Sequence, residues 1–169
     1  GLERDLAPLV LLVGHGSQSA NNAHAAALDC GACCGQTGEV NARSLAQLLN
    51  DPAVSTGLRE QGTVVPAATW FVAALHNTTT DEIEGFDLDT LPPAARAHWE
   101  RVLARAGHRV RRERAPLLGL DPVVPAEALL ARLRRRASDG AQTRPEWGLA
   151  GNAAFVIAPR SRTLGTDLQ

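Results

Sequence analysis

The sequence of 169 residues contains no lysine, no methionine and no tyrosine, and aromatic residues make up only 4% of it. Its 17 basic residues, all of them arginine, are balanced by 18 acidic residues, so the formal net charge is −1. A protein without net positive charge lacks the electrostatic attraction that most nucleic-acid-binding proteins use, so we expect no nucleic-acid partner. No apolar stretch approaches the roughly 18 residues that span a bilayer, and the first residues do not have the layout of a signal peptide.

The missing methionine bears on what kind of chain this is. Because the sequence begins with Gly1 and has no methionine, it is either a processed chain or a fragment of a larger protein, and we favour the fragment. The length suits one domain with its own core and is too short for two. We therefore expect residues 1–169 to form a single α/β domain that is part of a larger protein.

Cysteine is also scarce, and its three occurrences are clustered at Cys30, Cys33 and Cys34. An odd number of cysteines within five residues is a poor disulfide framework, and a bridge between adjacent cysteines is strained. The pattern predicts thiols or metal ligands in a reducing, cytoplasmic compartment.

The apolar runs and stop signals predict an α/β fold with a mostly parallel sheet flanked by helices. Two runs predict buried parallel strands, and a third lies near the end of the chain; the three are Pro8–Val13, Thr69–Leu75 and Ala153–Ala158. Helical spacing, prolines at helix starts and polar stops predict four helices. These are Val40–Leu49, Pro52–Gln61, about Ala94–Ala106, which continues into a basic run, and Ala126–Ala137.

Each of the first two strands is followed by a histidine and polar residues. Ligands of open α/β sheets gather beyond the carboxyl ends of the strands, so His15 and His76 could lie near one another if the strands are parallel neighbours. The polar string His76–Asp81 could hydrogen-bond a small polar substrate or a metal-bound water. It could equally be a turn in which Thr80 or Asp81 starts a helix.

A long loop, Gly14–Gly38, contains the candidate metal ligands His15 and Cys30. Imidazole and thiolate are good zinc ligands, but a separation of fifteen residues is not a zinc-finger spacing. The alternative is a histidine that caps the next helix and a small buried cysteine. Cys30 and Cys33 also form a Cys-x-x-Cys pair, which suits redox or metal chemistry. Asp29 could orient a metal-bound histidine.

Other motifs indicate ordinary structural roles. The glycine-rich start of the loop, Gly14–Ser17, matches neither standard phosphate-binding pattern, and no lysine is present to reach a phosphate. The arginine runs Arg109–Arg114 and Arg132–Arg136 are typical of solvated helix faces. Glu39 and Arg43 are spaced for an ion pair on one helix.

Five strings, within a span from about Val13 to Arg160, resemble the DabA family. They are Gly14–Ser17, Leu28–Cys33, Gly38–Arg43, Ala74–Asp81 and Arg144–Asn152. The resemblance implies that the chain is a fragment of a large zinc-binding subunit of a bacterial inorganic carbon transporter. It also implies a partial core similar to that of a β-type carbonic anhydrase.

The resemblance further implies a zinc site of which this chain holds half. In the family, a Cys-x-Asp pair from an earlier segment joins a histidine and a cysteine that map to His15 and Cys30. Cys33 is not carried over as a ligand, and Cys34 stands where the family pattern has glycine. No Cys-x-Asp occurs in these 169 residues, so the chain alone is expected to be inactive.

The activity implied by the resemblance is zinc-hydroxide hydration of CO2 to bicarbonate within an energy-coupled uptake complex. Zn²⁺ lowers the pKa of bound water to about 7, which makes this chemistry feasible at neutral pH. The implied partner is the membrane subunit DabB, with this chain peripheral on the cytoplasmic face of the cell inner membrane. Two alternatives without catalysis stay open: a structural zinc module closed by four protein ligands, and a thiol-redox α/β module.

Overall fold

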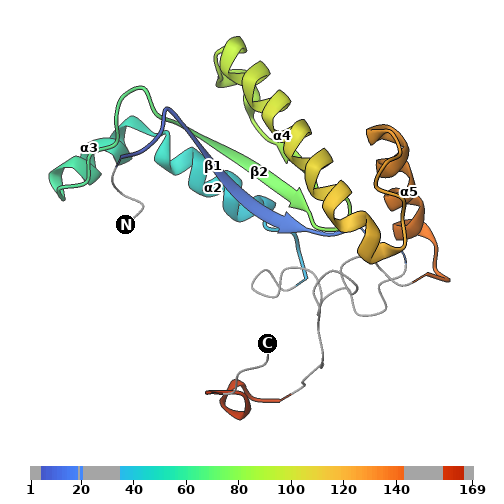
Figure 1. Ribbon diagram of the computed structural model, residues 1–169. Coiled ribbons are helices and arrows are strands. Elements are labelled where there is room, and N and C mark those ends of the chain that lie inside the picture. The colour runs from blue at the N-terminus through green and yellow to red at the C-terminus, as the bar shows by residue number, and fades with distance from the viewer. Residues whose placement is uncertain (1–4, 19, 21–34, 143–157, 166–169) are drawn as a thin grey trace.

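The computed structural model describes residues 5–18, 20, 35–142 and 158–165, and these form an α/β fold (Figure 1). The described part has a three-stranded sheet and four α-helices. In chain order the elements are β1 (Leu9–Gly16), α2 (Glu39–Leu49), α3 (Pro52–Glu60), β2 (Trp70–Asn77), β3 (Glu82–Gly85), the 3-10 helix η2 (Leu88–Thr90), α4 (Pro93–Arg114), the 3-10 helix η3 (Ala115–Leu118), α5 (Ala126–Ser138) and the 3-10 helix η4 (Arg160–Arg162).

The sheet has the order β1-β2-β3 and is mixed rather than mostly parallel. The two predicted strands are confirmed and pair in parallel, while β3 was not predicted and pairs with β2 in the antiparallel direction. Among the described residues β1 is an edge strand, and its residues Leu9–Leu12 are half-buried instead of buried as expected. The third apolar run, Ala153–Ala158, lies almost entirely outside the described residues.

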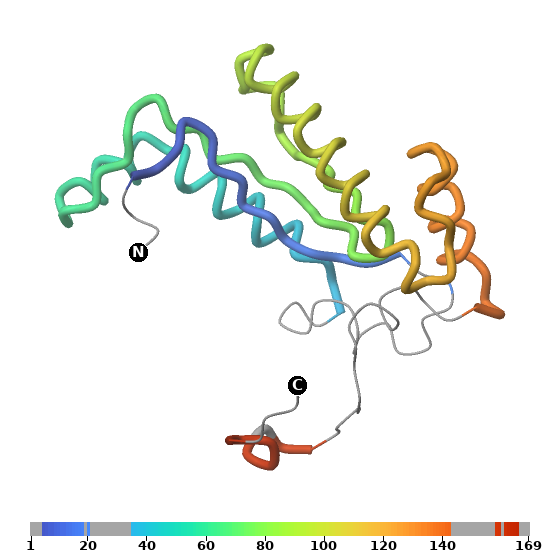
Figure 2. The backbone as a smooth tube through the Cα atoms, in the orientation of Figure 1, coloured from blue at the N-terminus to red at the C-terminus, as the bar shows by residue number. Residues whose placement is uncertain are grey.

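The two faces of the sheet carry different helices. Helix α2 packs on the face formed by alternate residues of β1 and β2, including Val10, Phe71 and Ala73. Helix α4 lies on the opposite face, where a side chain at Gly85 of β3 would collide with the buried indole of Trp99. Figure 1 and the tube view of Figure 2 show α2 on one side of the strands and α4 with α5 on the other.

Helix α2 contacts the sheet through small residues, and much of its apolar surface faces outward. Ala42 and Ala46 are buried against the strands. Val40, Leu45 and Leu48 are 70%, 46% and 54% exposed. Alanine allows the helix backbone to approach the sheet closely, so the larger apolar residues that mark this helix in the sequence lie on its outer side.

The helix boundaries follow the predicted start and stop signals. Asp51 caps α3 by accepting a hydrogen bond from the backbone N–H of Ala53 at 2.7 Å. Proline stands in the first turn of α4, which continues as one helix through the basic run to Arg114. In the part of the chain that the structure describes, no helix combines the length and hydropathy needed to cross a lipid bilayer.

Two arginines of α4 fix the turn between β2 and β3. Arg111 is buried, and its Nη1 donates to the backbone oxygens of Thr80 and Asp81 at 3.2 and 3.1 Å. Arg114 donates to the Asp81 carboxylate at 2.5 Å. Gly107 makes this approach possible, because a Cβ there would lie 2.6 Å from the Asp81 carbonyl oxygen. We call these contacts the arginine clamp.

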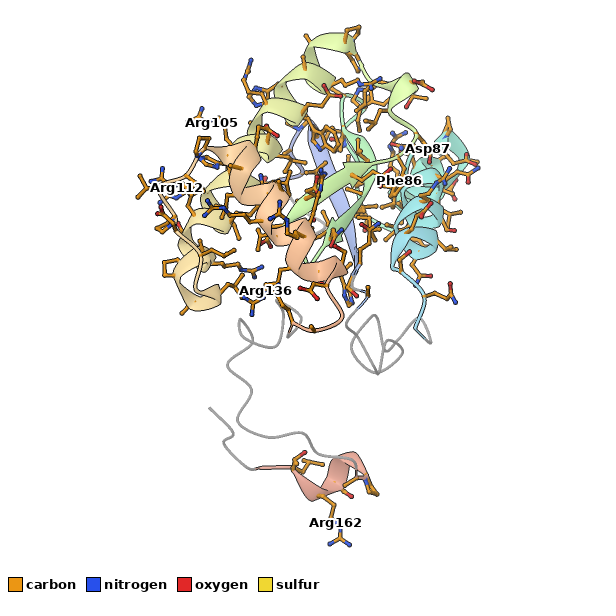
Figure 3. The ribbon with its side chains drawn as sticks, turned by 90° about the vertical axis from the view of Figure 1, so that its right-hand side faces the viewer. Phe86, Asp87, Arg105, Arg112, Arg136 and Arg162 are labelled. Carbon is orange, nitrogen blue, oxygen red and sulfur yellow. The ribbon has the colours of Figure 1, made fainter. Side chains whose placement is uncertain are left out.

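The arginine runs are therefore only partly solvated, and the expectation of solvated helix faces was wrong for several positions. In α5, Arg136 is half-buried and donates to the Leu118 carbonyl oxygen at 2.7 Å, whereas Arg134 stays 60% exposed although it forms an ion pair with Glu82 of β3. Figure 3 shows Arg105, Arg112 and Arg136 along the two neighbouring helices. Spacing along a helix does not reveal which arginines meet backbone oxygens from another element.

A contact between two glycines joins the end of β1 to the start of α2. A Cβ on Gly14 would lie 2.5 Å from the carbonyl oxygen of Gly38, and the Gly38 N–H donates to the His15 carbonyl oxygen at 2.8 Å. Because the obstructing atoms are backbone, no side chain can move aside to make room. This contact holds the backbone of His15 against the segment that leads into α2.

The arginine clamp predicts that Asp81→Asn lowers the free energy of unfolding by about 2 to 3 kcal/mol, because Arg114 loses its carboxylate in a largely buried place. Asparagine accepts the left-handed backbone conformation of Asp81, whose φ is 55°, so the change removes charge without adding backbone strain. Chemical denaturation of the purified protein measures the effect.

Asp87→Asn is the matched control, because Asp87 has the same φ of 55° and also pairs with an arginine, Arg43, but its side chain is 61% exposed. The control should change stability far less than Asp81→Asn. Equal losses in the two variants would contradict the clamp.

The glycine contact predicts that Gly14→Ala destabilises the fold by about 1 to 3 kcal/mol through overpacking against backbone. Gly57→Ala in α3 should have the opposite sign and stabilise by roughly 0.5 to 1 kcal/mol, because nothing lies within 4 Å of a Cβ there and alanine favours helix. Denaturation curves of the two single variants test the pair. A Gly14→Ala protein as stable as the parent would show that the contact is not tight.

Candidate metal centre

The parallel pairing of β1 with β2 places His15 opposite His76. The two are register partners at the carboxyl ends of their strands, one step before Gly16 and Asn77. Opposite residues of paired strands share a face, so both imidazoles lie on the face that α4 covers further along the sheet. The expected proximity of the two histidines is confirmed.

His15 is exposed and its imidazole makes no hydrogen bond to the described residues. Its backbone is nevertheless held on both sides, by the β2 ladder and by the bond from Gly38. An imidazole on a fixed backbone, with both ring nitrogens open, has the properties of a metal ligand. His15 does not cap the following helix within the described residues, which was the alternative role.

Cys30 lies outside the described residues, as do the neighbouring candidates Cys33 and Cys34. The described chain nevertheless leaves from and returns to the His15 end of the sheet. Gln18 precedes the undescribed stretch, and Gly38, eight residues after Cys30, contacts His15.

His76 is oriented by a buried carboxylate. Its Nε2 lies 3.1 Å from Asp81 Oδ1, and Asp81 is in turn held by the arginine clamp. Asp81 is 6% exposed, whereas the His76 side chain is 32% exposed. The polar string thus forms a tight turn into β3, and the alternative that Thr80 or Asp81 starts a helix is wrong.

Hydrogen bonds tie the residues after β1 to the turn after β2. The Thr78 N–H and hydroxyl both donate to the Gly16 carbonyl oxygen, at 2.9 and 3.1 Å. The Gln18 N–H donates to the Thr79 hydroxyl oxygen at 3.1 Å. A cavity of about 490 Å³ lies here on the α2 face of the sheet, lined in part by Gly16, Gln18 and Asn77. The strand ends therefore form a rigid polar rim.

The described residues do not by themselves make a complete metal site. No cluster of three or more His, Cys, Asp or Glu side chains with metal-binding geometry occurs among them. Zinc prefers four ligands, so His15 could serve only with ligands from elsewhere in the protein.

The arginine clamp is the part of the site that sequence reasoning missed. Arg111 and Arg114 reach Asp81 from thirty or more residues away and from a different element. One signal was available: the string His76–Asp81 contains a carboxylate and no cation, and a buried carboxylate needs one. The signal does not say which of the 17 arginines supplies it.

A larger cavity, of about 620 Å³, lies away from both histidines. It is lined by α2 and the start of β2, at the amino end of the parallel strands, with Arg43 and Phe86 at its wall. Arg43 forms the predicted ion pair with Glu39 and also binds Asp87; the hydrogen bond to Asp87 is the main cause of a raised Arg43 pKa. Neither histidine lines this cavity, so volume alone does not identify the candidate metal centre.

Comparison with known proteins gives matches to one family over the whole of this chain. The family model described as "Probable inorganic carbon transporter subunit DabA" matches residues 1–169. A protein of that name from Paracidovorax citrulli is 75% identical over 99% of this chain, which covers 21% of the relative. Another from Methylovorus glucosotrophus is 72% identical over 100% of this chain and 20% of the relative. No solved structure matches.

A more distant relative of the same name, from Acidithiobacillus ferrooxidans, is 51% identical over 100% of this chain and 21% of its own length. The chain thus spans about a fifth of the length of the curated relatives it matches. The family model and these identities agree over the whole sequence. The chain belongs to the DabA family of probable inorganic carbon transporter subunits.

Proposed function

We propose that this chain supplies His15 and Cys30 as two ligands of a Zn²⁺ ion in an inorganic carbon uptake complex that hydrates CO2 to bicarbonate. The observation that carries the proposal is the position of His15. Its imidazole is exposed and unbonded among the described residues, at the carboxyl end of a strand whose backbone is fixed. Ligand sites of α/β sheets occur at such strand ends.

The donor chemistry supports zinc at this place. Neutral imidazole and thiolate are standard zinc ligands, and a catalytic zinc site has three protein ligands and one open position. We infer that the remaining ligands come from a Cys-x-Asp pair elsewhere in the longer protein, as the family resemblance implies. When bound, zinc supplies Lewis-acid activation of water for the attack on CO2.

The residues of this chain have separate tasks in the proposal. His15 and Cys30 bind the ion, and the contact between Gly14 and Gly38 keeps the His15 backbone in place. His76, held by Asp81, forms the neighbouring polar wall of the site. The rigid rim formed by Gly16 and the threonines limits how far the two strand ends can separate.

The same proposal includes a larger α/β domain. Residues 1–169 form one unit of it, and the continuous sheet extends beyond β1 into a core similar to that of β-type carbonic anhydrases. Two features support this extension: β1 is an apolar edge strand among the described residues, and α2 exposes Val40, Leu45 and Leu48. Long apolar edges are normally covered in native proteins.

The proposed partner is the membrane subunit DabB, with CO2 and bicarbonate as substrate and product. The chain would then sit peripherally on the cytoplasmic face of the inner membrane. Support comes from the relatives, which are named as transporter subunits and are about five times as long as this chain.

Zinc content tests the ligand assignment. In the full-length protein, His15→Ala and Cys30→Ala should each abolish stoichiometric zinc, measured by elemental analysis after purification, because each removes one protein ligand. His98→Ala is the matched control, since His98 is exposed on α4 and accepts only a local contact from Arg101. Stoichiometric zinc in both His15→Ala and Cys30→Ala would end the assignment.

Uptake of labelled bicarbonate and CO2 tests the function separately. Cells that express the full-length protein together with DabB should accumulate labelled carbon, and His15→Ala should reduce accumulation to the level of cells without the protein. Expression levels of the variant and of His98→Ala must match. Wild-type accumulation by His15→Ala cells would show that the zinc ligand does not serve uptake.

A further inference from the structure

The arginines of this chain are concentrated in one layer of the fold. Residues 93–138, which contain α4, η3 and α5, hold 11 of the 17 arginines and four of the 18 acidic residues, so this segment has a formal net charge of +7. The remaining residues of the chain carry a formal net charge of −8. The arginine clamp uses part of this positive charge inside the fold, and another part lies on the surface.

Four exposed arginines form a stripe along the outer side of α4. They are Arg101, Arg105, Arg109 and Arg112. Their spacing of four, four and three residues places them on one side of the helix, and at 1.5 Å per residue the stripe is about 16 Å long. The buried residues Trp99 and Arg111 mark the opposite side of α4, which faces the sheet. Figure 3 shows Arg105 and Arg112 at the same edge of the molecule. We call the four residues the arginine stripe.

The arginine stripe has few acidic partners. Among the described residues, three of its four arginines form no ion pair, and the exception is Arg109, which pairs with Glu113. The other glutamate of α4, Glu100, pairs with Arg96 outside the stripe. Cations four residues apart on a helix repel each other, so an anionic surface beside the stripe would relieve a repulsion that is otherwise present.

Exposed apolar side chains lie at one end of the stripe. Arg112 Nε donates to the carbonyl oxygen of Pro122 at 3.1 Å, which places the next residue, Val123, beside the C-terminal end of the stripe. Val123 is 78% exposed, and Leu117 of η3, which directly follows α4, is 68% exposed. The Asp121 carboxylate accepts a hydrogen bond from the Val123 N–H at 2.9 Å and so fixes the tip of this loop. We call Leu117 and Val123 the apolar corner.

An anionic lipid bilayer offers a counterpart to both features. Its headgroups carry the negative charge that the stripe lacks, and its interfacial layer takes up apolar side chains such as those of the corner. Burial of the stripe against protein would instead need a carboxylate for each unpaired arginine, because an unpaired buried charge is unfavourable. The outer side of α2 is apolar by contrast, with Val40, Leu45 and Leu48 exposed, and is the surface that suits contact with protein.

We propose that the arginine stripe and the apolar corner bind the anionic headgroups of a lipid bilayer directly, without a partner subunit. In this arrangement α4 lies along the bilayer surface, and the side chains of Leu117 and Val123 enter the interfacial layer. Arginine suits the role because its planar guanidinium donates to two phosphate oxygens at once. The inference rests on the peripheral membrane position in the proposed function, but it needs neither zinc nor DabB.

Flotation with lipid vesicles tests the proposal on the full-length protein in the absence of DabB. Vesicles of phosphatidylglycerol and phosphatidylethanolamine should carry the protein to the top of a density gradient, whereas vesicles of phosphatidylcholine should not. Sodium chloride at about 0.5 M should release most of the bound protein, because the Debye length then falls to about 4 Å.

Arg105→Gln should weaken binding to the anionic vesicles about fivefold, and the double variant Arg101→Gln/Arg105→Gln about 25-fold, because each arginine near an anionic surface contributes about a factor of five. Val123→Ser should weaken binding several-fold by removing an apolar contact. Arg59→Gln is the matched control, since it removes the same charge from an exposed position of α3, which Figure 1 shows away from α4. The control should bind like the parent.

Circular dichroism checks that these surface variants are folded. Equal binding by Arg105→Gln and Arg59→Gln, or equal binding of the parent to anionic and neutral vesicles, would overturn the proposal. A parent protein that binds no vesicle would also overturn it and would point to an acidic protein surface as the partner of the stripe. Zinc content of Arg105→Gln should equal that of the parent, and His15→Ala should float like the parent, so a failure here is distinct from a failure of the zinc assignment.

Discussion

The arrangement of the candidate site depends on the in-register parallel pairing of β1 with β2. That pairing brings His15 and His76 to the same sheet face although they are sixty-one positions apart along the chain. A slip of one residue would turn one of the two imidazoles to the opposite face. The contact between Gly14 and Gly38 and the bonds from Thr78 to Gly16 secure the strand ends at this register. The position proposed for His15 at the zinc site follows from this geometry.

The buried carboxylate of Asp81 is neutralised by an arginine from a different secondary-structure element. Asp81 is buried in the left-handed conformation, binds His76 and is neutralised by Arg114, while Arg111 holds the backbone of the same turn. The turn therefore connects the strand end at His76 to helix α4.

Much of this fold could be predicted from local pattern. Continuous apolar runs identified β1 and β2, proline and capping residues identified the helices, and the rule for strand ends brought His15 to His76. The failures have physical causes. Strand β3 is four residues long and carries two glutamates, so it has no apolar signal.

The arginine clamp depends on contacts between elements, which spacing along one helix cannot encode. Helix α2 buries alanines and exposes its larger apolar residues, whereas the largest apolar residues of a helix are normally assumed to face the core. The ligand role of Cys30 rests on family resemblance, since the residue lies outside the described structure.

We propose that one zinc ion is shared between this chain and ligands from elsewhere in a longer protein. X-ray absorption spectroscopy at the zinc edge, on the full-length protein, tests it most directly. A zinc ion bound by thiolate and imidazole should give sulfur scattering at about 2.3 Å and imidazole scattering at about 2.0 Å in the same spectrum. The proposal also predicts that the imidazole contribution disappears, with the zinc itself, in a His15→Ala protein. A zinc spectrum without sulfur or without imidazole, or one unchanged by that substitution, would contradict the account.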